Sequence, residues 1–332
     1  MKKEMSQQRL FSNIYSVKNI TVEYVMRNMS VKAVNNVSID IRNGEALGIV
    51  GESGSGKTTL ALSLLNLVPP PGKITNGRII FDGKIDVLTL REEELRKFRW
   101  KQVAMVFQGA LNSFNPVLRI GDQMLETIME HENVDKEEAL ERISKLLKLV
   151  RLEPNRTMKA FPHELSGGMK QRAMIATSLL LNPRVLILDE PTTALDVISQ
   201  KYILNILSDL KKKLEITMIL LTHDLAICTE LVDRVAVMYA GRIVEIAKME
   251  DLFLKPKHPY TIGLMQAIPS VIGDVKELKP IPGSPPDMFN MPSGCPFHPR
   301  CPYAIERCKK EEPYLEETSE DHLVACHRWR EI

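Results

Sequence analysis

Every residue from Gly51 to Thr58 fits the pattern of a loop that binds phosphate groups. The stretch reads GESGSGKT and matches G-x-x-x-x-G-K-[ST] without exception. Glycines let backbone N–H groups turn inward around phosphate, and the helix that follows adds the positive end of its dipole. Lys57 would pair with the β- and γ-phosphates, and the Thr58 hydroxyl would be a Mg²⁺ ligand. The predicted nucleotide-binding residues here are Gly51, Ser53, Gly54, Ser55, Gly56, Lys57, Thr58 and Thr59.

A pair of carboxylates, Asp189 and Glu190, follows the apolar run at residues 185–188. We expect this run to be a buried strand that delivers the pair to the carboxyl edge of a parallel sheet, where ligands bind. Asp189 would hold Mg²⁺ through water, and Glu190 would act as general base toward the attacking water. An apolar run that ends in Asp-Glu is a weak signal alone, and it becomes strong beside the phosphate loop.

Two further polar residues come at the ends of apolar runs. Gln108 follows residues 103–107, and it would contact Mg²⁺ or the attacking water. His223 comes just after residues 216–221, so it would emerge at the nucleotide edge and contact the γ-phosphate. A lone His or Gln is more often structural, and these two gain weight from their place in the series.

The elements that must position these residues alternate between strands and helices. Residues 58–68 predict a helix that ends at three prolines, and the middle part of the chain, roughly residues 109–163, is predicted to be helical. Within that stretch Asp135 and Glu138 resemble a capping box, and the apolar residues that follow at helical spacing should pack into the core. Predicted strands lie at residues 34–41, 46–50, 79–81, 103–107, 185–188, 216–221 and 235–239.

The last part of the chain has a different composition. Twelve of the 20 prolines lie between Pro256 and Pro313, a density that excludes long helices and central strands. Such a module has too few apolar residues to fold firmly alone, so it needs a cross-link that acts as a structural staple. The clustered cysteines could supply this cross-link. Cys228 lies far from them in an apolar stretch and should be a core residue. The clustered cysteines are Cys295, Cys301, Cys308 and Cys326.

Four thiolates can hold either Zn²⁺ or an iron–sulfur cluster, and thiols without metal are the third alternative. Pairs with two intervening residues, which are typical of zinc knuckles, are missing, and this favours the cluster. Mixed ligation stays open because His298, His322 and His327 lie nearby in sequence. A structural staple is favoured over a redox sensor, and loss of Cys301 is expected to leave nucleotide binding largely intact.

Length and charge exclude several classes of protein. The chain has 332 residues, 44% of them apolar, which suits one large domain with a smaller appendage. The formal net charge of +2 argues against a dedicated nucleic-acid binder. No apolar stretch is long enough to span a membrane, and the polar start lacks a signal-peptide core. These features predict a cytosolic protein that reaches a membrane only through a partner.

The segment Leu165-Ser166-Gly167-Gly168-Met169 resembles the signature sequence of ATP-binding-cassette (ABC) ATPases, with Met where Gln is more usual. The other motifs of that family occur in the family's order, including residues 194–196, and the resemblance covers about residues 15–250. It implies an α/β P-loop core with an antiparallel β subdomain near the N-terminus and a helical subdomain at about 109–165. It also implies that Ser166 and Gly168 complete the ATP site of an opposite subunit, and that Tyr24 stacks on adenine.

Several segments resemble, more narrowly, the ATPases of oligopeptide and dipeptide importers. These are Asn112 to Leu118, Met169 to Arg172, and the tail motifs at residues 258–261, 282–286 and 294–301. The resemblance implies a C-terminal module at 251–332 whose four cysteines carry a [4Fe–4S] cluster, with zinc as the alternative. Its implied partners are a second ABC ATPase, identical or related, two transmembrane permease subunits and an extracellular binding protein. The chain would then sit at the cytoplasmic side of the membrane.

Other functions remain as alternatives. Relatives import nickel or oligosaccharides. A DNA-repair cassette would carry a long coiled coil between the phosphate loop and the signature, but only about 107 residues separate Thr58 from Leu165. A translation-associated cassette protein would normally carry two cassettes. A regulatory subunit without activity would lack the catalytic groups that are present here.

Overall fold

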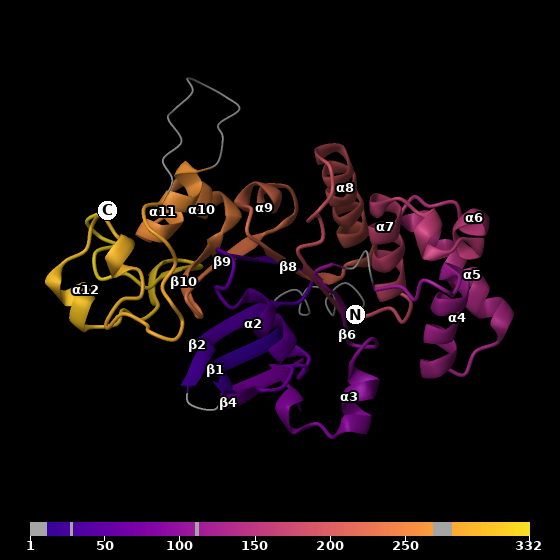
Figure 1. Ribbon diagram of the computed structural model, residues 1–332, viewed down its shortest axis with the longest axis horizontal. Coiled ribbons are helices and arrows are strands. Elements are labelled where there is room, and N and C mark those ends of the chain that lie inside the picture. Colours follow the sequence, from indigo (N-terminus) through magenta and orange to yellow (C-terminus); the bar gives the residue numbers. More distant parts are fainter. Residues whose placement is uncertain (1–11, 27–28, 110–112, 268–280) are drawn as a thin grey trace, which may run out of the picture. The chain divides into compact units, whose positions relative to one another are not determined.

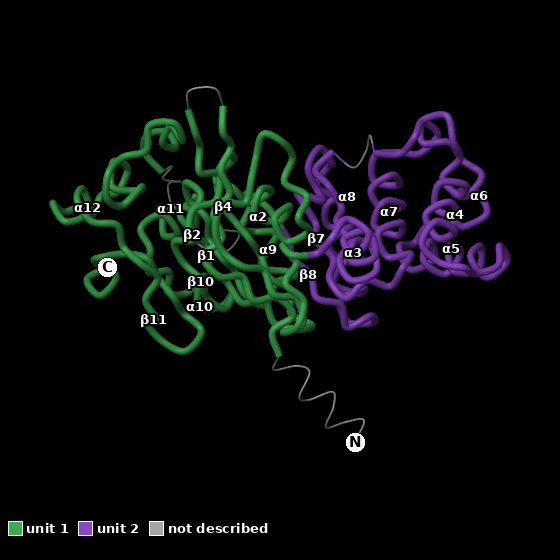
Figure 2. Tube along the Cα trace, turned by 90° about the horizontal axis from the view of Figure 1, so that it is seen from below, with its two compact units in different colours: residues 1–89, 221–332 green, residues 90–220 purple. Residues whose placement is uncertain are grey.

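The computed structural model describes residues 12–26, 29–109, 113–267 and 281–332. The chain forms two compact units, residues 1–89 with 221–332 and residues 90–220 (Figure 2). The first unit carries the phosphate loop and the tail, and the second carries the predicted helical stretch. In the described parts of the chain, no helix is both long and apolar enough to cross a membrane. The division into functional domains at 15–250 and 251–332 stays a prediction.

The first unit begins with an antiparallel sheet in the order β2-β1-β4-β5 (Figure 1). Along β2 the buried residues Val37, Ile39 and Ile41 alternate with more exposed ones, as in a sheet with one face on the core. This confirms the antiparallel subdomain that the family resemblance implies. Its strands are β1 (Asn13–Met26), β2 (Met29–Arg42), β4 (Gly72–Phe81) and β5 (Ile85–Asp86).

A second set of strands in this unit runs in the order β11-β12-β10-β9-β3. β3 and β9 are parallel and buried along their whole length, which explains why their sequences are apolar apart from Arg234. The tail adds β12, which pairs antiparallel with β10, and β11 at the edge. The strands are β3 (Ala46–Val50), β9 (Arg234–Tyr239), β10 (Arg242–Lys248), β11 (Glu316–Ser319) and β12 (His322–Val324).

The helix after the phosphate loop is shorter than the sequence predicts. α2 ends at Leu64, four residues before the predicted end at residue 68. Asn66 adopts the left-handed conformation with φ +48°, and the N–H of Leu67 turns back to the carbonyl of Leu62. The helix therefore closes before it reaches the prolines. The helices of this unit are α2 (Lys57–Leu64), α9 (Leu225–Leu231), α10 (Met249–Leu254), α11 (Pro259–Gln266) and α12 (Glu306–Lys310), with 3₁₀ turns η1 (Val87–Thr89) and η4 (His298–Arg300).

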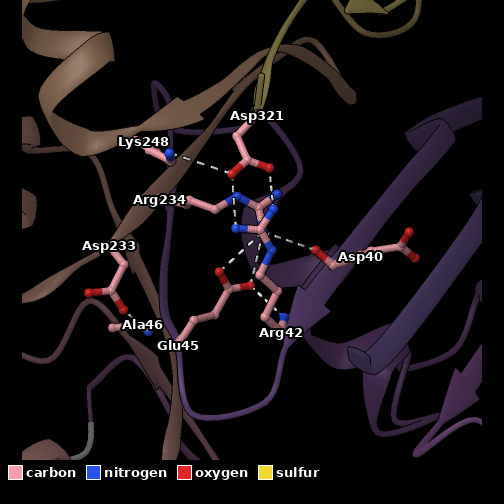
Figure 3. Close-up of polar contacts among 8 residues, drawn as sticks. All are labelled: Asp40, Arg42, Glu45, Ala46, Asp233, Arg234, Lys248 and Asp321. Carbon is pink, nitrogen blue, oxygen red and sulfur yellow. Dashed lines mark hydrogen bonds and ion pairs between the residues drawn. The ribbon is translucent and has the colours of Figure 1, made fainter. Parts of the chain in front are cut away.

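Charged side chains tie the tail to the sheet (Figure 3). Asp321, in the turn between β11 and β12, forms an ion pair with Arg42 at the end of β2 and lies 3.8 Å from the Nζ of Lys248. Beside them the buried Arg234 Nη1 donates to both carboxylate oxygens of Glu45 at 3.1 Å. The tail is thus held by ion pairs as well as by backbone pairing.

The second unit has three neighbouring strands in the order β8-β7-β6, with β6 and β7 parallel. Its helices confirm the predicted helical stretch from Ile120 onward, whereas residues 113–119 lie outside any helix. Asp135 caps α5, accepting from the N–H of Glu138 at 2.7 Å, and Ile143 and Leu147 lie in the core as predicted. The strands are β6 (Val103–Val106), β7 (Val185–Asp189) and β8 (Thr217–Thr222); the helices are α3 (Glu92–Phe98), α4 (Ile120–His131), α5 (Lys136–Leu149), α6 (Pro154–Lys159), α7 (Gly167–Ser178) and α8 (Val197–Leu214), with a 3₁₀ turn η3 (Pro162–Glu164).

Candidate functional site

The phosphate loop follows β3 and leads into α2, as the sequence predicts. Gly54 and Gly56 have φ of +79° and +99°, values that favour glycine. A Cβ at Gly51 would lie 2.1 Å from the carbonyl oxygen of Met238, and one at Gly56 would lie 2.2 Å from that of Ala33. These two glycines are therefore required by the backbone packing around the loop.

Lys57 is the first residue of α2 and is only 6% exposed. Its Nζ donates to the carbonyl oxygens of Gly51 at 2.7 Å and Glu52 at 3.0 Å. The N–H of Gly241 donates to the carbonyl of Ser55 at 3.0 Å, which fixes the loop from outside. The ammonium group thus lies within the curve of the loop, where it can meet phosphate oxygens. Thr58, predicted as a Mg²⁺ ligand, is exposed.

In the second unit, the predicted carboxylates lie at the carboxyl end of β7. Asp189 is its last residue and is 2% exposed, and Glu190 follows with φ +46°. The Nε2 of Gln108, after β6, donates to Glu190 Oε2 at 2.9 Å. Parallel pairing of β6 and β7 brings these two predicted residues together. Thr193, which belongs to none of the motifs predicted from the sequence, also donates its hydroxyl to Glu190 Oε2, at 2.9 Å.

The signature residues lie at the start of α7. Ser166 is its N-cap, and the Ser166 Oγ accepts from the N–H of Met169 at 3.3 Å. Gly168 lies in the first turn, where a Cβ would meet only Ser199, at 3.5 Å or more. A helix N-terminus with small residues offers free N–H groups to an anion. The geometry suits the predicted phosphate-binding edge, and the contact with an opposite subunit stays a prediction.

For three other residues named from the sequence, the structure does not test the predicted role. His223 is exposed just after β8. Tyr24 is half-buried near the end of β1, and its ring lies against Gly72 of β4, where a Cβ would be 2.8 Å from Tyr24 Cε1. Stacking of Tyr24 on adenine and contact of His223 with phosphate therefore stay predictions. Asn112 lies outside the described residues.

The four clustered cysteines approach one another in the tail. The pKa of Cys295 is raised to about 12 and that of Cys326 to about 11, mainly by burial and in part by charge on the other thiols. Burial also raises the pKa of the Cys301 thiol, to which Cys308 contributes. None of the five cysteines is in a disulfide, and in the described ranges no three His, Cys, Asp or Glu side chains are placed as ligands of one metal ion.

Backbone amides face three of these sulfurs. The N–H of Arg328 donates to Cys326 Sγ at 3.4 Å. Hydrogen bonds from the N–H groups of Phe297 and Tyr303 likewise oppose the rise in the pKa of Cys295 and Cys301 that burial causes. In each case the donor lies two positions after the cysteine. Such N–H groups stabilise thiolate, the form that binds a metal.

The three histidines that sequence left open as ligands have ring nitrogens engaged elsewhere. His322 Nε2 lies 2.7 Å from the buried carboxylate of Glu245, while His298 Nδ1 and His327 Nε2 lie 3.0 and 2.9 Å from carbonyl oxygens. Cys228 is fully buried, and burial raises the pKa of its thiol, so it is the core residue that was predicted.

Two family models match the chain in succession. Residues 34–193 match the model described as "ABC transporter", and residues 244–308 match "Oligopeptide/dipeptide transporter, C-terminal region".

Curated relatives match over nearly the whole length. The dipeptide transport ATP-binding protein DppD of Caldanaerobacter subterraneus subsp. tengcongensis is 47% identical over 96% of this chain and 98% of the relative. The oligopeptide transport ATP-binding protein OppD of Escherichia coli K12 is 44% identical over 95% of this chain and 93% of the relative.

Solved structures share the fold over the greater part of the chain. A dimeric post-hydrolysis state of the cassette MJ0796, bound to ADP and Pi, matches with a TM-score of 0.62 and 31% identity, covering 71% of this chain and 98% of that one. The cbiO1 protein of Clostridium perfringens, part of the ABC transporter complex cbiONQ, matches with a TM-score of 0.63 and 29% identity, covering 76% and 95%.

Proposed function

Because this chain belongs to the ABC transporter family, we propose that it is the ATP-hydrolysing subunit of an importer for dipeptides or oligopeptides. The observation that carries this proposal is a preformed phosphate loop combined with a tail that matches the oligopeptide/dipeptide transporter region. DppD and OppD, which match over both parts, are transport ATP-binding proteins for such peptides.

The chemistry follows from the residues described above. Lys57 and the loop amides would bind the phosphates. In the first unit Thr58 would supply a ligand to Mg²⁺, and in the second unit Asp189 would hold Mg²⁺ through water. Glu190 takes a proton from the attacking water, while Gln108 and Thr193 orient its carboxylate through their hydrogen bonds to Oε2. His223 contacts the γ-phosphate.

We propose that two such ATPases, identical or related, close around ATP and reopen after hydrolysis. Ser166 and Gly168 of each would contact the γ-phosphate bound by the other. The dimeric state of the MJ0796 cassette supports this arrangement. Two membrane permease subunits would convert the motion into transport and hold the chain at the cytoplasmic face, and an extracellular binding protein would select the peptide.

We propose in addition that the four clustered cysteines hold a [4Fe–4S] cluster, with zinc as the alternative. Burial and the charge of neighbouring thiols raise the pKa of Cys295, Cys301 and Cys326, so these thiols do not readily ionise together without a cation, whereas bound metal deprotonates its thiol ligands. The N–H groups that face three of the sulfurs suit thiolate ligands. When bound, the centre would supply a cross-link among four segments of the tail.

Metal analysis tests the cysteine site. Protein purified without oxygen should be brown and contain about four iron and four sulfide per chain. Colourless protein with one zinc would reject the iron–sulfur assignment but retain the metal site. Absence of all metal would reject both.

Uptake by cells tests the transport proposal. A strain that lacks this chain should lose import of labelled di- and oligopeptides, and the wild-type chain should restore it while Lys57→Ala should not. Lys84→Ala is the matched control, because Lys84 is an exposed lysine in the turn between β4 and β5. Normal peptide uptake together with lost uptake of nickel or oligosaccharide would assign the alternative substrate.

A further inference from the structure

Every polar group of Glu52, the second residue of the phosphate loop, has a partner. Its N–H donates to the hydroxyl of Tyr260 at 2.9 Å, and its carbonyl accepts from Lys57 Nζ at 3.0 Å. Its carboxylate accepts from Arg300, with Nη1 to Oε2 at 2.8 Å and Nη2 to Oε1 at 3.0 Å. The loop pattern allows any residue at this position, so phosphate binding alone does not explain these contacts.

Arg300 reaches the loop from the cysteine module, which is the described part of the tail, residues 281–332, that carries the four clustered cysteines. It ends η4, between Cys295 and Cys301, and lies 248 positions from Glu52. Its side chain is 5% exposed, its Nε donates to the carbonyl of Pro282 at 2.9 Å, and its Nη1 donates to the hydroxyl of Tyr239 at 3.3 Å. A guanidinium can hold a carboxylate by two parallel bonds, which an ammonium cannot do.

Two physical consequences follow for the loop. First, Arg300 fixes the side chain of the same residue whose carbonyl holds Lys57, so it restrains the peptide that orients the ammonium group. Second, it neutralises a carboxylate that is 28% exposed beside the place where phosphate binds. Without Arg300 that charge would repel the nucleotide.

We infer that Arg300 is a positioning residue for the phosphate loop, so that the folded state of the cysteine module sets the affinity of the loop for nucleotide phosphate. The inference rests on the proposed function only in that the loop binds ATP. It does not depend on which metal the cysteines hold. Tyr260 supports the same loop residue from α11, and its ring packs against Tyr239 and Phe297.

Equilibrium binding of Mg²⁺-ADP to the full-length chain tests the inference, because ADP occupies the loop without being hydrolysed. Arg300→Ala should weaken binding about tenfold, since it leaves an unpaired carboxylate at the loop. Removing that charge as well, in Arg300→Ala with Glu52→Gln, should recover most of the loss. A merely structural role for Arg300 predicts no such rescue, because Glu52→Gln cannot repair the tail.

Three further variants complete the test. Arg307→Ala is the matched control, because Arg307 pairs with Glu311 on the exposed surface of the same module. It should bind ADP like the wild type. If Arg300→Ala fails to fold, Arg300→Lys takes its place and should show a smaller loss with the same rescue. Lys57→Ala should bind ADP poorly, and normal binding by it would overturn the phosphate site instead.

The inference is overturned if the Arg300 variants bind ADP within about twofold of the wild type. It is also overturned if Glu52→Gln adds to the loss rather than reversing it. Either result, obtained together with weak binding by Lys57→Ala, would leave the proposed ATPase function in place.

Discussion

A single carboxylate oxygen of Glu190 accepts hydrogen bonds from both Gln108 and Thr193. Two donors on Oε2 fix the orientation of the carboxylate that would accept a proton from the attacking water. The main chain at Glu190 is left-handed, with φ +46°, which turns the residue sharply away from the strand. At the scale of single residues, the proposed hydrolysis depends on a Glu190 carboxylate oriented to take a proton from the attacking water.

Glu190→Gln should retain ATP binding and lose nearly all turnover, because an amide of the same shape cannot accept a proton from water. We expect a fall of at least about 100-fold in the rate of phosphate release. Phosphate release and nucleotide binding are measured on the same preparation. Glu215→Gln, at the end of α8, serves as the control. Near-normal hydrolysis by the first variant would show that Glu190 is not the base.

His258 gives the fold a dependence on pH. It is fully buried at the start of α11, where its Nδ1 accepts from the N–H of Tyr260 at 3.1 Å. Burial lowers the pKa of His258 from the ordinary 6.5 to about 4, although the charge of Glu245 opposes the shift. The unfolded chain therefore binds a proton more readily, and the stabilisation present above pH 6.5 is lost as pH falls toward 4.

The free energy of unfolding should therefore be roughly 2 kcal/mol lower at pH 5 than at pH 8 through His258 alone. His258→Asn keeps an acceptor at the helix N-cap but does not titrate. Urea unfolding of both proteins at the two pH values measures the difference. An equal pH dependence in the variant would assign the effect to other groups.

At the scale of elements, the N-termini of two helices position predicted phosphate-binding residues. α2 begins at Lys57, and α7 begins after its cap Ser166. Both starts can be predicted from the sequence, because Gly56 and Ser166 occupy the N-cap positions, where glycine and serine are preferred. The C-terminal end of α2 was predicted wrongly, since the turn at Asn66 closes the helix before the prolines.

Ser166→Arg should leave nucleotide binding by the single chain unchanged and block ATP-driven association of two chains. A long cationic side chain would occupy the proposed contact with the opposite γ-phosphate. Light scattering with Mg²⁺-ATP in the Glu190→Gln background measures association. Because any replacement also removes the cap to Met169, at a cost of about 1 kcal/mol, Ser166→Ala is the control. Association of the Arg variant like that of the Ala variant would refute the two-chain site.

At the scale of the whole molecule, the tail belongs to the same compact unit as the phosphate loop. It contributes β11 and β12, the ion pair from Asp321 to Arg42, and the pair from Arg300 to Glu52. The sequence alone predicts that the cysteines only stabilise the tail and that loss of Cys301 leaves nucleotide binding largely intact. The contacts at Arg300 change that expectation, because the module and the loop share one hydrogen-bonded network.

Cys301→Ser should therefore have two effects. It should raise the protease sensitivity of the tail, and it should weaken Mg²⁺-ADP binding through the neighbouring Arg300. Limited proteolysis and calorimetry measure these on one sample. Cys228→Ser would damage the core instead, so the better control is Ser293→Ala, in the same module but outside the cysteine set. A loosened tail with unchanged ADP binding would separate the staple from the loop.

The sequence by itself determined the phosphate loop, the carboxylate pair, the signature and the class of the protein. Each of these depends on residues that are adjacent or nearly so, and their chemistry fixes their spacing. The alternation of strands and helices was also readable, because burial on one or both faces leaves a periodic apolar pattern. The predicted roles of Tyr24 and His223 depend on a bound nucleotide and stay predictions.

Only the tertiary structure decided which distant residues meet. Arg300 and Glu52 lie 248 positions apart, and nothing in the sequence around either one indicates the other. The same holds for Asp321 with Arg42 and for the buried Glu245 with His322. Such pairs form because the folded sheet brings remote segments together, and an ion pair leaves no periodic signal in sequence. For this reason the chemistry of the loop was predictable, whereas its support from the tail was not.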